Sequence, residues 1–345
     1  MKSKYFVEWD CLSCKTRATR REFIMGMGGL AAAALLREQK LLAQTTPYRI
    51  DVHHHYAAPE FQAEMTKRGA GNPNYRNWVP RVSLDEMDKS AVATSMISVT
   101  RPGVWFGDRE LAKRLARICN DFGAKLVRDY PGRFGLFAVL PLPDVDGSLK
   151  EIEYAYDTLK CDGVAVMSNY DDIYLGDPRI APVMDELNRR KAIVYEHPVR
   201  EDRDNPLNGI ELITETTRSI ASVLYNGTVA RCPDIRFIWA HGGGTVAAAS
   251  NRMGGTAAKL PKGLMYELQR FYYDTGQAQA KPILQSLKAL VPVSQILFGT
   301  DFPLIAAGGI LNTAKGIREN GGFTEAELRA IDRDNALKLF PRLKT

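Results

Sequence analysis

Histidine is scarce in this sequence of 345 residues, which contains only five. Cysteine is equally rare, and five scattered residues, an odd number, exclude a fold built on disulfides. No Gly-x-Gly-x-x-Gly follows the first apolar run, which argues against an open dinucleotide-binding sheet. What is present is an ordinary globular composition, 45% hydrophobic and 25% charged. The length suits one large α/β barrel or two average domains.

The N-terminal segment has the features of an export leader. Arg20 and Arg21 stand beside a weakly apolar run at 23–36, which small and polar residues follow. That run is shorter than the ~20 residues that a membrane-spanning helix needs. We predict that residues 1–43 are a twin-arginine signal peptide, cleaved near Ala43 to release a periplasmic protein. The alternative is an N-terminal amphipathic helix of the mature protein.

Removing the leader changes the charge of the chain. The sequence carries +6 overall, but residues 1–43 hold eight basic and four acidic side chains and contribute +4. The remaining +2 forms no long basic stripe, so we expect no nucleic-acid partner, and no membrane association after processing. Cys11 and Cys14 fall inside the leader. The other cysteines are expected to be buried thiols: Cys119, Cys161 and Cys232.

Short apolar runs alternate with amphipathic helical patterns after residue 47. The expected strands are 48–53, 93–99, 134–140, 163–167, 192–197, 235–241, 271–274 and 295–299. They are apolar throughout, as strands covered on both faces are. The alternation predicts one α/β domain at 45–345, a (β/α)8 TIM barrel. A capping box at 83–86 predicts a helix start, and the Gly/Asn/Pro-rich residues 66–82 predict a long loop over the barrel mouth.

All the histidines fall at the ends of predicted strands. The first strand leads into His53, His54 and His55, the fifth ends at His197, the sixth at His241, and Asp301 follows the eighth. Residues two apart in a strand share a face, so His53 and His55 point together into the barrel mouth and His54 points away. Taken singly, each of these histidines has an ordinary structural explanation, and Asp301 could cap a helix. Jointly they predict a metal site at the carboxyl ends of the strands, where barrel enzymes carry their chemistry.

Glu196 is an unexpected residue in this pattern. It precedes His197 in the fifth predicted strand, so alternation turns it away from the barrel axis toward the helices. A carboxylate buried there needs a partner. We expect at most an indirect role for it, and a structural or supporting role for His54.

The motifs resemble the amidohydrolase superfamily over about residues 48–340. Its signature is Asp-x-His-x-His after strand 1, then His, His and Asp at strands 5, 6 and 8. Glu-Thr-Thr-Arg at 215–218, Ala-His-Gly-Gly-Gly at 240–244 and Gly-Thr-Asp-Phe-Pro at 299–303 are similar to the decarboxylase branch. That branch includes aminocarboxymuconate semialdehyde, γ-resorcylate and 6-methylsalicylate decarboxylases. Residues 163–170 and 174–178 look most like the 6-methylsalicylate type.

The resemblance implies one divalent metal ion, Zn²⁺ or Mn²⁺. Its ligands would be His53, His55, His197 and Asp301, and His241 or Asp301 would deliver a proton during catalysis. Two-metal hydrolases of the superfamily bridge their metals with a lysine at the end of strand 4. Here strand 4 ends without one, and Lys160 precedes that strand at its wrong end.

The resemblance also implies a small-molecule carboxylic acid substrate and a homodimer. Arg252 has the spacing from His241 at which branch members carry a substrate-binding arginine across a dimer interface. Arg101, just beyond strand 2, is a second candidate because guanidinium pairs well with carboxylate. Trp105 and Phe106 would wall an aromatic substrate.

Three functions remain open at this stage. The first is a metal-dependent, non-oxidative decarboxylase of an aromatic acid, such as a hydroxybenzoate or 6-methylsalicylate, or of an unsaturated carboxylic acid. The second is a metal-dependent hydrolase of a lactone, amide or ester. The third is an exported ligand-binding protein without catalysis.

Overall fold

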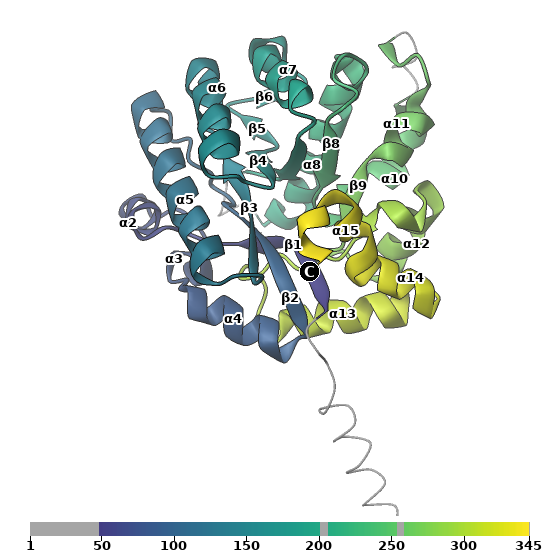
Figure 1. Ribbon diagram of the computed structural model, residues 1–345. Coiled ribbons are helices and arrows are strands. Elements are labelled where there is room, and N and C mark those ends of the chain that lie inside the picture. Colours follow the sequence, from purple (N-terminus) through teal and green to yellow (C-terminus); the bar gives the residue numbers. More distant parts are fainter. Residues whose placement is uncertain (1–47, 201–205, 254–258, 345) are drawn as a thin grey trace, which may run out of the picture. The chain divides into compact units, whose positions relative to one another are not determined.

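The described chain forms a parallel β-barrel surrounded by helices (Figure 1). The computed structural model describes residues 48–200, 206–253 and 259–344. The barrel strands, in their hydrogen-bonded order, are β1 (Arg49–His55), β2 (Val92–Ser98), β3 (Phe134–Val139), β4 (Gly163–Met167), β7 (Ile193–His197), β8 (Arg236–Trp239), β9 (Tyr272–Asp274) and β10 (Ile296–Leu297). A separate antiparallel hairpin pairs β5 (Asn169–Tyr170) with β6 (Ile173–Tyr174).

The ends of the sheet meet, and the barrel closes. The backbone N–H of Val52 donates to the carbonyl of Phe298 at 2.9 Å, and that of His55 donates to the carbonyl of Phe302 at 2.8 Å. His54 and Phe302 form an isolated parallel bridge. β1 is thereby joined to the segment that contains and follows β10. The predicted TIM barrel is confirmed.

Helices follow most strands and cover the outside of the barrel. They are α2 (Pro59–Lys67), α3 (Pro73–Arg76), α4 (Pro80–Lys89), α5 (Arg109–Asp129), α6 (Val145–Glu153), α7 (Ala181–Arg189), α8 (Asn208–Tyr225), α9 (Thr228–Arg231), α10 (Val246–Ala249), α11 (Leu264–Arg270), α12 (Lys281–Leu290), α13 (Gly309–Asn320), α14 (Glu325–Arg329) and α15 (Asn335–Leu339). In the described part of the chain, no helix combines the length and the apolar character needed to cross a membrane.

Two apolar clusters hold the barrel together. The larger lies between the strands and the outer helices, and the smaller fills the barrel interior with side chains such as Val52, Phe137 and Tyr195. Phe340, just after α15, packs on Phe137 with ring centroids 5.8 Å apart. The interior below the strand ends is therefore filled, which leaves the carboxyl ends of the strands for a site.

Two local predictions were wrong. Residues 66–82 are not one long loop, because they contain the end of α2, all of α3 and the first turn of α4. α4 begins at Pro80 rather than at a capping box on Ser83. Proline starts a helix well because it needs no partner for a backbone N–H, whereas Ser83 lies buried inside the helix and uses its hydroxyl elsewhere.

Candidate metal centre

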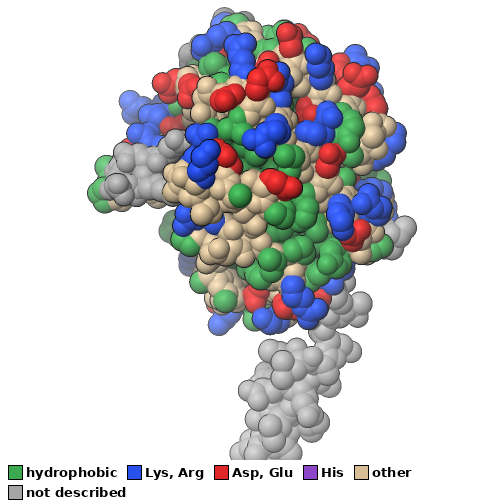
Figure 2. All heavy atoms as spheres, turned by 90° about the vertical axis from the view of Figure 1, so that its left-hand side faces the viewer, with side chains coloured by type: hydrophobic (Ala, Val, Ile, Leu, Met, Phe, Trp, Pro, Cys, Tyr) green, Lys and Arg blue, Asp and Glu red, His purple; other side chains and the backbone are tan. Residues whose placement is uncertain are grey.

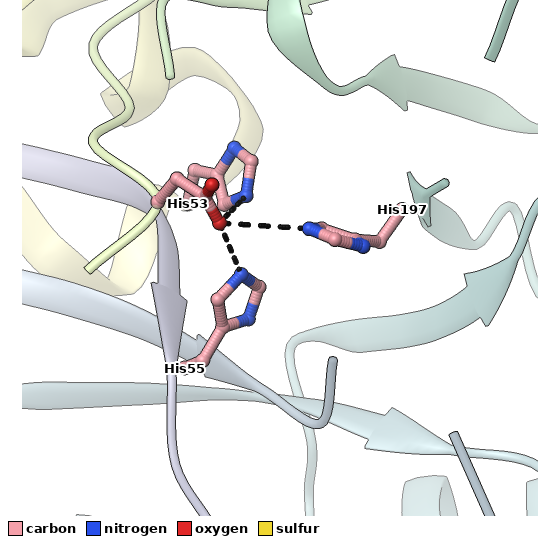
Figure 3. A group of neighbouring side chains, drawn as sticks. His53, His55 and His197 are labelled. Atoms are coloured by element: carbon pink, nitrogen blue, oxygen red, sulfur yellow. Dashed lines mark hydrogen bonds and ion pairs between the residues drawn. The ribbon is translucent and has the colours of Figure 1, made fainter. Parts of the chain in front are cut away.

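Three imidazoles converge on one carboxylate at the carboxyl ends of the strands. Nε2 of His53 and Nε2 of His55 each lie 3.0 Å from Oδ1 of Asp301, and Nε2 of His197 lies 3.5 Å from it. Figure 3 shows the three labelled rings directed at the same oxygen. The four side chains are buried, and one ligand atom from each lies within 4.8 Å of all the others. The structure thus brings together the four predicted ligands.

Two strands and one strained residue produce this convergence. His53 and His55 share a face of β1, and His197 ends β7. Asp301 adopts φ 68°, a left-handed conformation that is uncommon for a residue with a side chain. Its backbone N–H donates to the carbonyl of His53 at 2.8 Å, which holds it against β1. Strain of this kind persists where the surrounding structure enforces it, as it commonly does at functional sites.

The outer nitrogens of the rings have partners that set the tautomers. Nδ1 of His197 donates to the carbonyl of Pro198 at 2.9 Å, and Nδ1 of His55 lies 3.0 Å from the hydroxyl of Ser98. Nδ1 of His53 lies 2.9 Å from the carboxylate of Asp274. With the proton at Nδ1, each ring presents the lone pair of Nε2 to the centre, which is the form that binds a metal.

Burial keeps two of these rings uncharged. It lowers the pKa of His55 to about 4 and that of His197 well below its usual range. Burial also lowers the pKa of His53, but the carboxylates of Asp274 and Asp301 outweigh it and raise that pKa to about 10. Burial raises the pKa of Asp301, yet the neighbouring histidines hold it well below its usual range. The centre therefore attracts positive charge, from a proton or a metal ion.

The donor set fits a divalent metal ion. Both ring nitrogens of His53 are buried and make no hydrogen bond among the described residues, although Nδ1 lies 2.9 Å from Asp274 and Nε2 lies 3.0 Å from Asp301. Three imidazole nitrogens with one carboxylate oxygen form the mixed set that Zn²⁺ and similar ions accept. β4 ends at Met167 without a lysine, and Lys160 precedes that strand.

His241 lies beside the four ligands without joining them. Its ring centroid is 4.9 Å from that of His53 and 5.6 Å from that of His197. Nδ1 donates to the carbonyl of Gly276 at 2.7 Å, so Nε2 carries a lone pair. Burial lowers the pKa of His241. As a whole residue His241 is only partly buried, unlike the ligands, and it lies where it can exchange a proton with a bound molecule.

His54 belongs to a sealed hydrogen-bond chain. Its Nδ1 lies 3.1 Å from Oδ2 of Asp51, and its Nε2 lies 2.7 Å from the hydroxyl of Ser83 on α4. Asp51 also accepts a hydrogen bond from the hydroxyl of Thr300 at 2.6 Å. The order Ser–His–Asp resembles a hydrolytic triad, but none of these side chains is exposed. These hydrogen bonds fasten β1 to α4 and to the segment that carries Asp301.

Asp274 is a site residue that the sequence reasoning missed. It ends β9 as a fully buried acid and contacts His53 as described above. The only available signal was an acidic residue at the end of the seventh predicted strand. Gln277 was missed as well, and its side-chain amide hydrogen-bonds the second oxygen of Asp301.

The two predicted arginines lie in different surroundings. Arg101 lines a cavity of about 1070 Å³ together with Trp105, Phe106 and Arg200. Arg101 directly follows Thr100, whose hydroxyl lies 3.2 Å from the ring of His197, although none of the four ligands lines the cavity itself. The aromatic loop is tied to the hairpin, because Nε1 of Trp105 donates to Asp171 at 2.7 Å.

Arg252 is not part of that cavity. It ends a 3-10 turn at Ser250–Arg252, it is exposed, and it is not among the residues that line the cavity with Arg101. The action of Arg252 across a dimer interface stays a prediction.

Glu196 does face the helices, as predicted. Thr216 on α8 donates its hydroxyl to Oε1 at 3.3 Å, and Oε2 has no hydrogen-bond partner among the described residues. Burial raises the pKa of Glu196 to about 8. Of the expected buried thiols, Cys119 and Cys232 are buried, whereas Cys161 is partly exposed.

The fold and the site together define a class of protein. A closed parallel barrel that gathers three histidines and an aspartate at the carboxyl ends of β1, β7 and β10 is a metal-binding TIM barrel. The sequence profile of the amidohydrolase family matches residues 50–342, so the chain belongs to that family.

Comparison with similar proteins shows to which branch of the family the chain is related. The chain is 34% identical to decarboxylase yanB of Aspergillus niger, over 86% of this chain and 88% of that protein. It is 32% identical to a 6-methylsalicylic acid decarboxylase of Penicillium expansum, over 86% and 97% of the two chains. Its fold is similar to the crystal structure of an amidohydrolase II, with a TM-score of 0.79 and 27% identity over 85% and 99% of the two chains. The resemblance to the decarboxylase branch is confirmed.

Proposed function

We propose that this protein is a metal-dependent, non-oxidative decarboxylase of an aromatic or unsaturated carboxylic acid. The observation that carries the proposal is the convergence of His53, His55 and His197 on Asp301. It occurs in a chain that resembles decarboxylases over 86% of its length. These relatives favour a carboxy-lyase over a hydrolase of lactones, amides or esters.

A metal ion held at the centre would bind the substrate carboxylate with a neighbouring oxygen and stabilise the charge that develops as CO₂ leaves. Arg101 lines a cavity and follows Thr100, which contacts His197, so its guanidinium is a candidate to attract an acid to this side of the barrel. Trp105 and Phe106 supply apolar surface for a ring.

The proton balance assigns a role to His241. In the reaction the ring carbon gains a proton, and the bond to the carboxylate breaks with its electron pair returning to the ring. Nε2 of His241 can take up a proton from solvent and deliver it to the ring carbon, because Nδ1 is engaged by Gly276. Asp301 is the poorer proton donor, because its pKa lies well below the usual range.

Product analysis tests the activity. Metal-loaded protein is incubated with 6-methylsalicylate, γ-resorcylate and related hydroxybenzoates, and CO₂ and the decarboxylated phenol are measured. We expect turnover of at least one acid, with none after treatment with a chelator. Absence of CO₂ from every acid, together with hydrolysis of a lactone or ester, would overturn the proposal.

The identity and number of the metal ions form a separate proposal. The donor set and the absence of a lysine at the end of β4 support one ion per chain, Zn²⁺ or Mn²⁺. Elemental analysis of the purified protein, followed by reconstitution of chelated protein with each ion, distinguishes them. Two ions per chain would contradict the proposal.

We also propose export through the twin-arginine route. The proposed leader, residues 1–43, lies outside the described residues, so its support is the pair Arg20–Arg21 beside a short apolar run. This route carries folded proteins, which suits an enzyme that acquires its metal before leaving the cytoplasm. Replacing both arginines by lysine should remove the protein from the periplasm, and an unchanged periplasmic level would contradict the proposal.

A further inference from the structure

The carboxylate of Asp274 contacts three separate parts of the site. It extends from the last residue of β9 and is fully buried. Oδ1 accepts the backbone N–H of His241 at 3.1 Å and that of Gly276 at 2.8 Å. Oδ2 lies 2.9 Å from Nδ1 of His53 on β1. One side chain thus joins a proposed metal ligand to the backbone that carries the proposed acid-base residue.

The contact with His53 has a chemical consequence. A carboxylate opposite Nδ1 keeps the proton on that nitrogen and leaves the lone pair of Nε2 for the centre, 3.0 Å from Asp301. A carboxylate behind a histidine also makes the ring a better metal ligand and fixes its orientation.

The contact with His241 has a geometric consequence. His241 adopts φ 55°, a conformation that costs free energy and must be held by its surroundings. Oδ1 of Asp274 holds the backbone of His241, while the carbonyl of Gly276 accepts the proton of its Nδ1. The same Oδ1 also accepts the N–H of Gly276, so the three residues form a closed set of hydrogen bonds.

Two glycines provide the room for this arrangement. A Cβ on Gly276 would lie 2.5 Å from Nδ1 of His53. A Cβ on Gly299 would lie 2.8 Å from the Cβ atoms of both Asp274 and His53. Distances below 3.0 Å require movement, so the close approach of Asp274 to His53 depends on glycine at both positions.

We infer that Asp274 is a positioning residue that couples the metal-binding tautomer of His53 to the placement of His241. The inference rests on the proposed function for the role of His241. Its metal-binding half is independent of any substrate.

The variant Asp274→Asn separates the two contacts. Its Oδ1 still accepts both backbone N–H groups, but its amide presents a donor to Nδ1 of His53. The ring then keeps its lone pair on Nδ1 and carries its proton on Nε2, where the metal would bind. Asp274→Ala removes both contacts, and Gly276→Ala displaces the His53 ring while keeping the carboxylate.

The measurements are metal affinity and kcat on the full chain. Competition with a chromogenic chelator should show a ~10–100-fold weaker affinity for Zn²⁺ in Asp274→Asn and in Gly276→Ala. With saturating metal and 6-methylsalicylate, kcat should fall further in Asp274→Ala than in Asp274→Asn, because only the alanine variant also loses the contact with the backbone of His241. Asp332→Asn, a buried acid near the start of β1, is the matched control and should retain affinity and kcat.

Each outcome decides one part of the inference. Unchanged metal affinity in Asp274→Asn overturns the coupling to His53, as does a loss of melting temperature without a loss of affinity. Equal kcat in the asparagine and alanine variants at saturating metal overturns the coupling to His241. If the wild-type protein binds Zn²⁺ but decarboxylates no acid, the proposed function fails, and the affinity measurements still judge Asp274.

Discussion

At the scale of single residues, the site depends on which nitrogen of each histidine holds the proton. The carbonyl of Pro198 accepts from Nδ1 of His197, and the carbonyl of Gly276 accepts from Nδ1 of His241. These backbone acceptors are fixed by the fold, so both rings keep Nε2 as an acceptor. Their positions give the two rings different roles. His197 points at Asp301 as a proposed metal ligand, whereas His241 lies beside the ring of His197 as the proposed acid-base residue.

Removing the shared carboxylate should abolish metal binding. Asp301→Asn deletes the charge that all three imidazoles face, so affinity for Zn²⁺ or Mn²⁺ should fall more than ~100-fold, beyond what a change behind a ligand costs. Chelator competition measures the loss, and circular dichroism checks the fold. A variant that keeps wild-type affinity would show that Asp301 is not a ligand.

Glu196 should make stability depend on pH. Its pKa is raised to about 8 in the folded protein from 4.5, so the folded state holds a proton that the unfolded state loses. Stability is therefore full below about pH 4.5 and falls as the pH rises to about 8. Glu196→Gln should equal the wild type in acid and exceed it at pH 8 by on the order of a few kcal/mol, measured by urea denaturation of chelated protein.

Glu186 provides a control, because its contribution to stability changes with pH in the opposite direction. The guanidinium of Arg189 lowers the pKa of Glu186 to about 2, although burial opposes this. Its ion pairs contribute above pH 4.5, and the contribution is lost as the pH falls toward 2. Glu186→Gln should therefore be slightly less stable than the wild type at neutral pH. A gain in Glu196→Gln that is the same at pH 5 and pH 8 would contradict the role assigned to burial.

At the scale of elements, the turn after β8 decides where His241 lies. Gly242, Gly243 and Gly244 all have positive φ, and the backbone N–H of Thr245 then donates to the hydroxyl of Thr217 on α8 at 2.8 Å. This turn seats the end of β8 against α8. The three consecutive glycines allow the backbone to take this path, because residues with side chains rarely adopt positive φ.

Alanine substitutions along this turn should differ in cost. A Cβ on Gly244 would lie 1.9 Å from the carbonyl oxygen of Ile213, so Gly244→Ala should cost about 3 kcal/mol or more. The nearest atoms to a Cβ on Gly242 lie at 3.5 Å, so Gly242→Ala should cost about 1–2 kcal/mol, from φ alone. Urea midpoints measure both, and equal losses would contradict the clash with α8.

The strands were the most predictable elements. β4 has the predicted bounds, and the other barrel strands differ from prediction by one or two residues at an end. Apolar runs covered on both faces carry a strong local signal. The start of α4 was mispredicted because Ser83 and Glu86 match a capping box, yet the tertiary structure uses the hydroxyl of Ser83 to bond His54 and Trp78.

At the scale of the whole molecule, the outer face drawn in Figure 2 is mixed in charge. On the face in Figure 2, basic side chains are interspersed with acidic ones rather than gathered in one patch. The four proposed metal ligands, in contrast, are buried at the carboxyl ends of the strands. The similarity to decarboxylases supports the expectation of a small carboxylic acid as the substrate. The expectation of no nucleic acid as a partner stays a prediction.

Mixed dimers would test whether Arg252 acts in trans. In the proposed homodimer, Arg252 of each chain serves the site of the other, so Arg252→Ala and Asp301→Asn should each have little activity alone. Co-expression should restore activity, because mixed dimers contain one complete site. If Arg252 served its own chain, every mixed site would lack one group, and activity would stay low. Size-exclusion chromatography with light scattering checks that dimers form.

The sequence by itself determined the barrel and the identity of the four predicted ligands. Strand periodicity places His53 and His55 on one face, and parallel strands bring their carboxyl ends to one edge. Only the tertiary structure decided how these groups are held. The contacts of Asp274 join β1, β9 and the turn after β8, and Arg252 is not among the residues that line the cavity with Arg101. Such contacts link residues far apart in the sequence, and no local periodicity records them.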